Sequence, residues 1–395
     1  MKNYSKIILK PGKERSLKNF HPWLFSGAIA KVDGKTNDGD IVEIYSAAGE
    51  YLATGHYNKG TITVRVFSFE QREIGYEFWK EKLQSAYDLR KNLNFISNRE
   101  TNVYRLIHAE GDGLPGLIID YYNGVAVMQS YTLGMHAIKR YVVEALKEIY
   151  ETELITVFDK STETMRKQSE LELENRYLYG KEYSNHSVTE NGNIFIVNFE
   201  SGQKTGFFID QRENRKLLSG YSVGKSVLNT FCYTGGFSVY ALNAGAKMVH
   251  SVDSSASAIE MTDKNISFCK NPERHVSFTE NVFDFIKKSD QMYDIIILDP
   301  PAFAKHKSSV KQASIAYRNL NAEAIKKMNK AGLIFTFSCS QVIDKILFRK
   351  IIFAGAAMTG RNVRVLYQLS QPADHPVSIY HPEGEYLKGL VLYVE

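Results

Sequence analysis

From Gln211 onward, the sequence alternates between helix-like segments and very apolar, strand-like segments. Parallel strands need a crossover connection, usually a helix, so this alternation predicts a doubly wound α/β domain with a mostly parallel sheet. We expect helices at 211–219, 236–244, 255–269 and 313–330, and strands at 226–231, 247–252, 275–279, 293–298 and 332–338. Ligands of such sheets bind beyond the carboxyl ends of the strands, where we look for functional residues.

The residues before Gln211 predict two smaller domains. Residues 1–72 contain short β-like runs broken by glycine and Asn/Asp turns, and 73–93 form a connecting amphipathic helix. A β-hairpin with strands at 194–199 and 206–210 leads into the α/β part. Between them we expect a mixed α+β domain, with strands at 105–108, 116–121, 125–130 and 154–159 and a helix at 135–150. The expected domains are therefore 1–72, 73–190 and 191–395.

Composition limits the classes of protein to which this chain can belong. Its 395 residues, 44% of them hydrophobic, are enough for two or three domains with real cores. A net charge of +5 suits a polyanionic partner. Three scattered cysteines fit neither a disulfide framework nor a clustered metal site, so we expect no metal. Without an apolar leader or a run of about 20 apolar residues, we expect a cytoplasmic protein with no membrane partner.

A glycine-containing turn after the first α/β strand indicates a cofactor site. This strand runs into Gly235-Gly236, and the next ends in Asp253, which is suitably spaced to accept hydrogen bonds from two ribose hydroxyls. A dinucleotide fold would carry Gly-x-Gly-x-x-Gly, whereas Phe231 and Tyr233 stand where a pyrophosphate needs bare backbone. S-adenosylmethionine (SAM), which has no phosphates, fits better than NAD or ATP; a simple tight turn is the alternative. The candidate contacts are Asn229, Phe231, Gly235, Asp253 and Ser254, together with Asp299 after a later strand.

Asp299-Pro300-Pro301 ends the strand expected at 293–298. Because proline stops the strand, the Asp299 carboxylate and the Pro300 carbonyl should point into the crevice, where they can hold the exocyclic amino group of a planar base. Phe303 follows and can stack on that base. A proline-capped strand end without function is the alternative interpretation.

Cys339 follows the strand at 332–338, so we expect it at the same edge of the sheet as Asp299. A thiolate can add to C6 of cytosine or uracil, which allows C5 to attack a sulfonium methyl group; loss of the C5 proton then expels the thiol. An inert buried thiol is the alternative for Cys339. For Cys232 and Cys269, that alternative is the preferred interpretation.

A series of motifs extends from the hairpin to the end of the chain. They are Gln203-Lys204-Thr205-Gly206-Phe207 with Asp210-Gln211-Arg212, Phe231-Cys232-Tyr233-Thr234-Gly235-Gly236-Phe237, Asp299-Pro300-Pro301, Thr336-Phe337-Ser338-Cys339-Ser340, Ala373-Asp374-His375-Pro376, and Pro382-Glu383-Gly384-Glu385-Tyr386-Leu387-Lys388-Gly389. In these motifs the chain resembles the family of ribosomal RNA large subunit methyltransferase I, over essentially its full length.

The resemblance implies a PUA-like RNA-binding domain, a central α+β domain and a Rossmann-like class I methyltransferase domain. It also implies SAM as cofactor and 23S ribosomal RNA as partner, naked or in an assembly intermediate, with 5-methylcytosine as product; a homodimer is left open. It places the methionine moiety of SAM near the hairpin and the helix after it, and the adenine near Asn281-Val282. Arg212 suits the cofactor carboxylate. The other candidates for the methionine moiety are Gln203, Thr205 and Asp210.

One position departs from better-known RNA cytosine-C5 methyltransferases. Those enzymes commonly carry a second cysteine just after the Asp-Pro segment, where this chain has Ala302. Cys339 must therefore act alone. The group that removes the C5 proton is left open between Asp299 and water.

The first domain carries a basic segment that predicts contact with RNA, because cations meet phosphates and aromatic rings stack on exposed bases. Lys10 and Arg15 are its main candidates, together with Lys13, Lys18, Phe20, His21 and Trp23. A solvated charge run is the alternative. For His375, a substrate contact and a structural role are both left open.

Three other functions compete with cytosine-C5 methylation. An RNA methyltransferase acting on a base nitrogen would have no use for Cys339. A non-catalytic RNA-binding or ribosome-assembly protein would need no SAM. A small-molecule methyltransferase would leave the first domain without a purpose.

Overall fold

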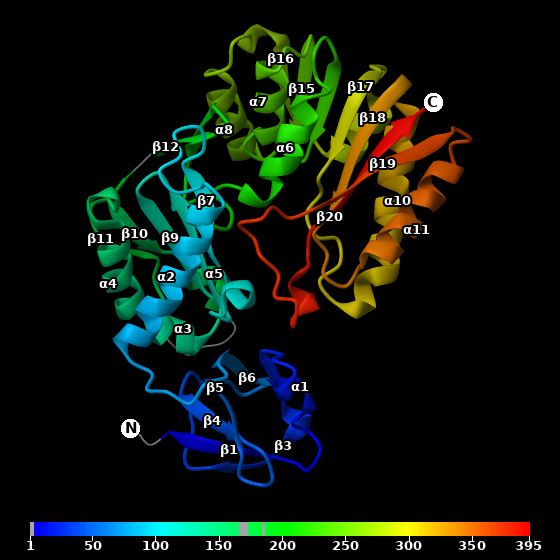
Figure 1. Ribbon diagram of the computed structural model, residues 1–395. Coiled ribbons are helices and arrows are strands. Elements are labelled where there is room, and N and C mark those ends of the chain that lie inside the picture. Colours follow the sequence, from blue (N-terminus) through cyan, green and yellow to red (C-terminus); the bar gives the residue numbers. More distant parts are fainter. Residues whose placement is uncertain (1–3, 166–172, 184–185) are drawn as a thin grey trace. The chain divides into compact units, whose positions relative to one another are not determined.

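Figure 1 shows the computed structural model, which describes residues 4–165, 173–183 and 186–395. The chain divides into two compact units, each assembled from three separate stretches. The first unit comprises Met1–Val188, Val197–Phe207 and Ala373–Gly384, and the second comprises Thr189–Ile196, Phe208–Pro372 and Glu385–Glu395. Within the described residues, no helix is both long enough and apolar enough to span a membrane.

The first unit begins with a six-stranded sheet in the order β2-β6-β5-β4-β1-β3. Only β1 and β4 are parallel; the other neighbours are antiparallel. Alternate residues of β4, such as Val42 and Ile44, are fully buried, so one face of the sheet packs on a core with Ile7 and Leu24. This confirms the β-rich first domain. Its elements are β1 (Ser5–Leu9), α1 (Arg15–Lys18), β2 (Trp23–Phe25), β3 (Ile29–Asp33), β4 (Ile41–Tyr45), β5 (Tyr51–Tyr57) and β6 (Ile62–Ser68).

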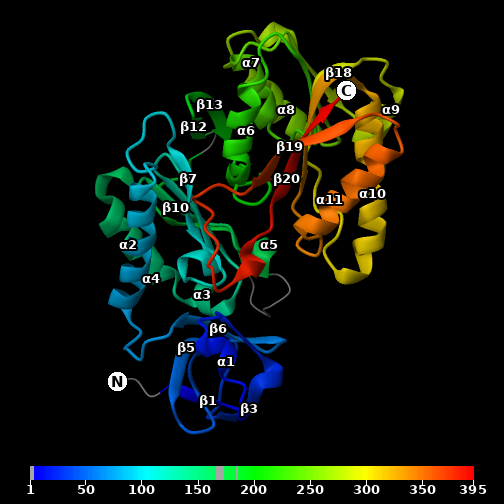
Figure 2. The ribbon, with the colours of Figure 1, turned by 45° about the vertical axis from the view of Figure 1, so that its right-hand side comes forward.

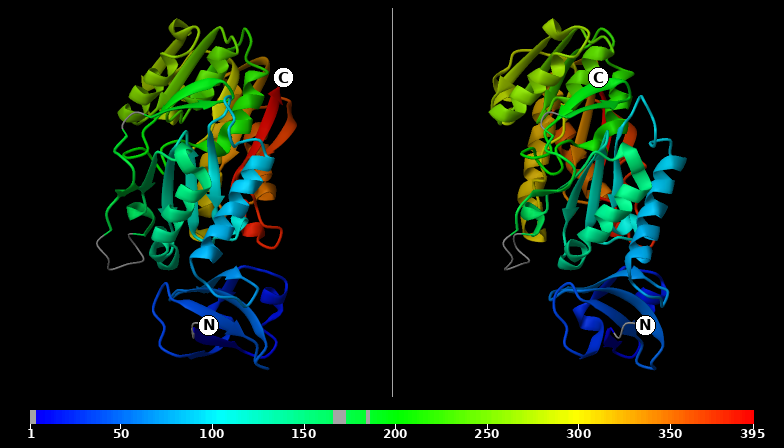
Figure 3. Two further views of the ribbon diagram at one scale, coloured as in Figure 1. Left: turned by 60° about the vertical axis from the view of Figure 1, so that its left-hand side comes forward. Right: turned by 90° about the vertical axis from the view of Figure 1, so that its left-hand side faces the viewer.

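A second sheet of the first unit has the order β11-β10-β9-β8-β7. The helices α2 and α4 lie side by side (Figure 3), and their residues Trp79 and Leu146 share one core with the sheet. Ile138 separates α3 from α4, so the single helix expected at 135–150 is in fact two. The elements are α2 (Tyr76–Asn92), β7 (Val103–His108), β8 (Leu117–Tyr122), β9 (Val125–Ser130), α3 (Leu133–Ala137), α4 (Lys139–Tyr150), β10 (Thr156–Asp159), α5 (Thr162–Met165) and β11 (Arg176–Tyr179).

The hairpin prediction, with strands at 194–199 and 206–210, is wrong in its second strand. The structure pairs β12 (His186–Glu190) with β13 (Asn193–Val197), and 209–211 form a turn of 3₁₀ helix instead of a strand. Asn191 and Gly192 link the strands with φ values of +47° and +76°. An Asn-Gly pair is the strongest short hairpin signal because both residues adopt positive φ readily.

The second unit contains the predicted doubly wound domain, as a seven-stranded sheet in the order β16-β15-β14-β17-β18-β20-β19. The first five strands in this order are parallel, whereas β20 is antiparallel to both of its neighbours. This confirms the mostly parallel sheet. The strands are β14 (Ser226–Thr230), β15 (Met248–Asp253), β16 (His275–Thr279), β17 (Tyr293–Leu298), β18 (Met328–Ser338), β19 (Val363–Ser370) and β20 (Lys388–Val394).

Helices cover both faces of this sheet. Figures 1 and 2 show α6, α7 and α8 on one face and α9, α10 and α11 on the other. The second group packs through Phe285, Tyr317 and Phe348 onto Ile296 and Ile334 of the sheet. The helices are α6 (Arg212–Ser219), α7 (Gly236–Asn243), α8 (Ala256–Ile266), α9 (Val282–Lys288), α10 (Val310–Lys326) and α11 (Lys345–Ala357). We did not expect α9, α11, β19 or β20 from the sequence.

A buried arginine holds the late segment Ala373–Gly384 within the first unit. Arg90 of α2 is fully buried and donates to the carbonyls of Arg105 and Asp374, each at 2.8 Å. Its guanidinium also pairs with both carboxylate oxygens of the buried Asp112.

We predict that Arg90→Met lowers the free energy of unfolding of the first unit by about 3–5 kcal/mol, because Asp112 would remain buried without its cation. Both tryptophans, Trp23 and Trp79, belong to this unit. Their fluorescence during urea denaturation therefore reports on it. Lys147→Met, which removes an exposed ion pair with Glu144, is the control and should change stability by less than about 1 kcal/mol. Equal effects of the two substitutions would contradict the importance of Arg90.

Candidate active site

The register of three parallel strands gathers the predicted residues of the second unit at one edge of its sheet. Thr230 of β14 lies opposite Leu298 of β17, which lies opposite Thr336 of β18. The strand order reverses between β14 and β17, and such a switch point is where open α/β sheets bind ligands. Asp299 and the turn after β14 therefore flank the same crevice.

The turn between β14 and α7 is held in an unusual backbone conformation. Phe231, Tyr233 and Gly235 have φ values of +53°, +48° and +75°. A Cβ on Gly235 would lie 2.8 Å from the Thr262 side chain, and one on Gly236 would lie 3.1 Å from that of Arg215. Packing against neighbouring side chains therefore favours glycine at both positions. Backbone strain of this kind is found mainly at functional sites.

Asp253 ends β15 and fixes this turn. One carboxylate oxygen accepts a hydrogen bond from the Tyr233 N–H and the other from the Ser255 N–H, each at 3.0 Å. A carboxylate can accept about four hydrogen bonds, so Asp253 retains capacity for ribose hydroxyls. Ser254 is exposed beside it. Asn229 differs from the expectation because its side chain is buried and donates to Ser238 at 2.9 Å within the core.

Asn281 caps α9 by accepting hydrogen bonds from the N–H groups of Phe283 and Asp284, and Val282 is buried. A row of aromatic rings begins here. Phe283 lies 6.1 Å from Phe303, which lies 4.6 Å from Tyr317, measured between ring centroids. Phe303, the predicted stacking residue, is thus half-buried and already packed on protein rings.

The segment before α6 offers an anionic and a cationic group close together in sequence. Asp210 accepts a hydrogen bond from the Tyr386 hydroxyl at 2.7 Å through Oδ2. Its other oxygen, Oδ1, is buried, and no described residue donates a hydrogen bond to it. Arg212, at the start of α6, is also buried. A buried acceptor and a buried guanidinium suit the ammonium and carboxylate of an amino acid such as the methionine moiety of SAM.

Arg215 organises this side of the site, although no sequence pattern points to it. Its guanidinium makes two 2.8 Å hydrogen bonds to Glu190 of β12 and one of 2.9 Å to the Phe208 carbonyl. Both charged side chains are almost completely buried. The ion pair therefore joins the hairpin to the segment that carries Asp210. Glu190 and Arg215 are far apart in the sequence, so no local pattern predicts their contact.

Asp299 follows β17, and its pKa is unusually high for a carboxyl group. Its pKa is raised to about 7, mainly by burial and then by the nearby Asp210 carboxylate, whereas a hydrogen bond from Gln211 and the charge of Arg215 oppose the shift. At neutral pH, the Asp299 carboxyl group is therefore divided between its protonated and ionised forms. It can donate or accept a hydrogen bond there. Titratable groups with such perturbed pKa values are candidates for functional residues.

Cys339 follows β18 and is partly exposed, whereas Cys232 and Cys269 are buried. Burial raises the pKa of Cys339 to about 11, and Asp299 and Asp210 act in the same direction, while Lys388 opposes them. Asp299 and Cys339 are thus close enough to interact electrostatically. The Tyr317 hydroxyl bonds to the hydroxyls of both flanking serines, Ser338 and Ser340, which fixes the loop. Burial also raises the pKa of Cys232 to about 12 and of Cys269 to about 11.

Two candidate cofactor residues, Gln203 and Thr205, belong to the first unit. The Thr205 hydroxyl is buried there and bonds to Asp120 at 2.6 Å and to Tyr122 at 2.9 Å. Contact of either residue with SAM stays a prediction. His375 is also buried in this unit, 3.0 Å from the Asp374 carboxylate.

Comparisons with known proteins agree with this geometry. Residues 7–69 match the family of PUA-like domains, and residues 116–347 match that of S-adenosylmethionine-dependent methyltransferases. The chain is 36% identical to ribosomal RNA large subunit methyltransferase I of Alteromonas mediterranea, over 99% of both chains. Identity to the same enzyme of Aeromonas hydrophila is 38%, over 98% of both. The chain belongs to this family. It is a SAM-dependent methyltransferase.

Solved structures support the fold and the cofactor. A candidate SAM-dependent methyltransferase from Streptococcus mutans is 26% identical, with a TM-score of 0.83 over 98% of this chain and 100% of that chain. A candidate methyltransferase solved in complex with SAH, also 26% identical, has a TM-score of 0.84 with the same coverage.

We predict that Asp299→Asn stabilises the protein in a pH-dependent way. Because the folded-state pKa of about 7 lies above the ordinary value of 3.8, ionised Asp299 destabilises the fold increasingly from about pH 4 to pH 7 and by a constant amount above pH 7. The variant should gain about 2–4 kcal/mol at pH 8 but only about 1 kcal/mol at pH 5. Calorimetric melting temperatures at the two pH values test this. A gain that does not increase with pH would contradict the assigned environment of Asp299.

Proposed function

We propose that this protein methylates C5 of a cytosine in 23S ribosomal RNA through a covalent bond between Cys339 and the base. The observation that carries the proposal is the partly exposed thiol after β18, in electrostatic contact with Asp299 after β17. The names of the full-length relatives support ribosomal RNA as the substrate. Methylation at a base nitrogen would give the thiol no role.

The residues around Cys339 suit recognition of cytosine. The Pro300 carbonyl can accept a hydrogen bond from the exocyclic amino group. In its protonated form, Asp299 can donate to the ring nitrogen N3, and a pKa near 7 keeps that form populated in neutral solution. The Asp299 donor and the Pro300 acceptor together match the N3 and amino groups of cytosine. They disfavour uracil, which presents an N–H and a carbonyl at those positions.

The reaction proceeds by formation and loss of one carbon–sulfur bond. The Cys339 thiolate attacks C6, and the electrons of the C5=C6 bond move into the ring, toward N3 beside Asp299. SAM supplies a methyl group on a positively charged sulfur. C5 takes this methyl group, after which loss of the C5 proton restores the double bond and releases the Cys339 thiolate. Asp299 and a water molecule are the two candidates to accept that proton.

The SAM contacts proposed on the second unit follow from the geometry of its crevice. Asp210 Oδ1 and Arg212 would hold the methionine moiety, and Asp253 the ribose. Asn281 and Val282 would lie against the adenine. The backbone of the Phe231–Gly235 turn would lie beneath the nucleoside. Gln203 and Thr205 are the candidates from the first unit.

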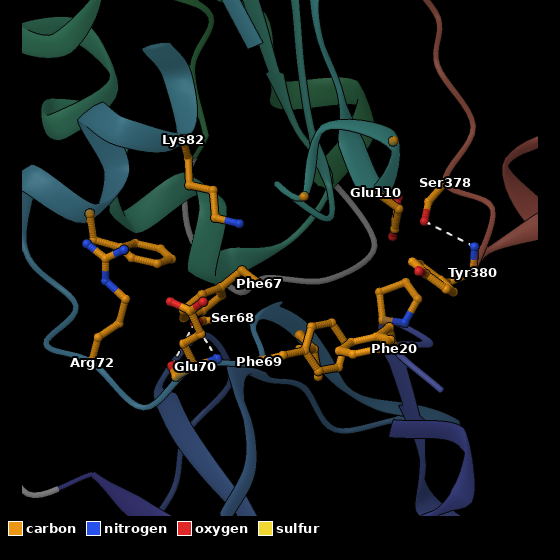
Figure 4. Close-up of a pocket in the computed structure, with 15 residues that line it drawn as sticks. Phe20, Phe67, Ser68, Phe69, Glu70, Arg72, Lys82, Glu110, Ser378 and Tyr380 are labelled. Carbon is orange, nitrogen blue, oxygen red and sulfur yellow. Dashed lines mark hydrogen bonds between the residues drawn. The ribbon is translucent and has the colours of Figure 1, made fainter. Parts of the chain in front are cut away.

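The first unit contains a pocket that we propose as a contact for an unpaired RNA nucleotide (Figure 4). Its volume is about 520 Å³. The rings of Phe69 and Tyr380 lie 5.2 and 5.3 Å from that of Phe20. Phe20 and Tyr380 are about half exposed, and Phe20 has a φ of +60°. Folding gains little from an exposed ring on a strained backbone, whereas base stacking would use it.

A lysine reaches the same pocket from α2. Burial and the charge of Arg72 lower the pKa of Lys82. No described carboxylate lies within 4 Å of the Lys82 ammonium group, which is therefore available to a phosphate. By contrast, Lys10 donates to the Gly27 carbonyl and Lys18 pairs with Glu50, while Arg15 is exposed on α1. Lys10 and Arg15 remain proposed RNA contacts alongside this pocket.

We predict that Cys339→Ala lowers methylation by at least about 10³-fold but leaves SAM affinity unchanged by calorimetry, because the thiol makes the covalent bond. Cys269→Ala is the matched control and should remain active. Nucleoside mass spectrometry of 23S rRNA with and without the protein identifies the product. RNA carrying 5-fluorocytosine should form a stable adduct with Cys339, since fluorine cannot leave as a proton. Turnover by Cys339→Ala, or a product methylated on a nitrogen, would refute the mechanism.

We predict that Tyr380→Leu weakens binding of the RNA substrate by about 5- to 100-fold, the loss of one stacked base, while kcat at saturating RNA stays constant. Tyr141→Leu, which changes an exposed ring on α4, is the control. Fluorescence anisotropy with labelled RNA measures both. Equal affinities of the two variants would remove the pocket from the RNA-binding surface.

A further inference from the structure

Lys388 is a buried lysine beside Cys339. It begins β20, where it pairs in register with Ser338 of β18, the residue just before the thiol. Only 6% of Lys388 is exposed, and its Nζ donates to the Ser340 carbonyl at 2.6 Å. Backbone hydrogen bonds on both sides therefore aim this amine at the Cys339 loop.

A buried amine in this position destabilises the fold. No described carboxylate lies within 4 Å of the Lys388 Nζ. An ammonium group removed from water without a carboxylate destabilises a protein by several kcal/mol, and an apolar side chain of the same length would fill the space without that penalty. A role in packing therefore does not explain the lysine.

The groups that act on Lys388 come from the elements packed around it. Burial lowers its pKa to about 8; Cys339 and Asp344 oppose the shift, and Lys345 adds to it. Ser370, its partner on β19, carries no charge. Lys388 in turn lowers the pKa of Cys339, whereas burial and the charges of Asp299 and Asp210 raise it. The amine and the thiol are thus coupled to each other.

We propose that the Lys388 amine accepts the thiol proton of Cys339 and pairs with the resulting thiolate during methylation. This role rests on the proposed covalent mechanism. Proton transfer turns a neutral amine and thiol into an ammonium–thiolate pair, which then forms the bond from Sγ to C6. When that bond breaks, the thiolate recovers its proton from Lys388. The C5 proton leaves by its separate acceptor, so the pair returns to its starting state after each turnover.

The protonation states of Lys388 and Cys339 determine how the reactivity of the thiol changes with pH. Below about pH 8, the amine is protonated and cannot accept the thiol proton, so the thiolate is scarce. Above that pH, the pair has lost one proton and the thiolate becomes available. The Cys339 pKa of about 11 already includes the favourable effect of Lys388, so without the amine the thiol would ionise only at still higher pH. The reactivity of Cys339 should therefore rise between about pH 8 and pH 11 in the native protein and rise later in a variant without the amine.

Alkylation of Cys339 by iodoacetamide in the free, full-length protein tests this coupling, with the modified peptide measured by mass spectrometry. Lys388→Met keeps the length of the side chain but removes the amine. It should lower the alkylation rate at pH 8 at least about tenfold and shift the whole rate profile to higher pH. Lys326→Met, which removes an exposed lysine of α10, is the control and should behave like the native protein. Unchanged SAM affinity by calorimetry verifies that each variant is folded.

The same variants separate this role from the covalent mechanism. If Cys339→Ala is inactive and the alkylation profile of Lys388→Met equals that of the native protein, the role of Lys388 is refuted while the mechanism stands. Retained methylation by Cys339→Ala instead refutes the mechanism, and with it any role of Lys388 in methylation. The expected result is a methylation rate for Lys388→Met that is about 10²-fold lower at pH 8 and partly recovers at pH 10.

Discussion

The buried ion pair between Arg215 and Glu190 is the interaction on which the cofactor side of the site depends. Arg215 reaches the hairpin through Glu190, the segment before α6 through the Phe208 carbonyl, and the glycine turn through its contact with Gly236. Three stretches of chain thus meet on one guanidinium. Its planar arrangement of donors can serve several acceptors at once, which a lysine cannot do. This junction positions the nearby residues Asp210 and Arg212.

The edge of the sheet at Asp299 and Cys339 holds charged groups away from the water that they prefer. Asp299 and Asp210 repel each other and disfavour a thiolate at Cys339, and Lys388 lies nearby with no described carboxylate within 4 Å of its amine. Each group alone would destabilise the fold. Their opposing effects are arranged around one loop, which the Tyr317 hydroxyl and the parallel strands keep rigid. Such strongly perturbed pKa values are typical of functional sites, where stability is commonly lower than packing alone would allow.

The sequence predicted the features that depend on local pattern. Apolar runs located β14, β17 and β18, and the residues that end them, Asp299 and Cys339, belong to one edge because parallel strands align their carboxyl ends. It could not predict contacts between distant segments. Arg215 with Glu190, and Lys388 with the Cys339 loop, exist only after the sheet has assembled. The strand expected at 206–210 is wrong because the apolar residues there are buried around a 3₁₀ turn, and the Asn191-Gly192 pair marks the actual hairpin.

The division of the chain into interleaved units has a consequence for its synthesis. Domains usually fold in order as they leave the ribosome, the first before the second. Here the first unit includes Ala373–Gly384, so Arg90 meets the Asp374 carbonyl only after a further 284 residues have been synthesised. Until then the core lacks a closing segment, and the Arg90 guanidinium lacks one of its acceptors. The first unit is therefore completed only after Phe208–Pro372 of the second unit has been made.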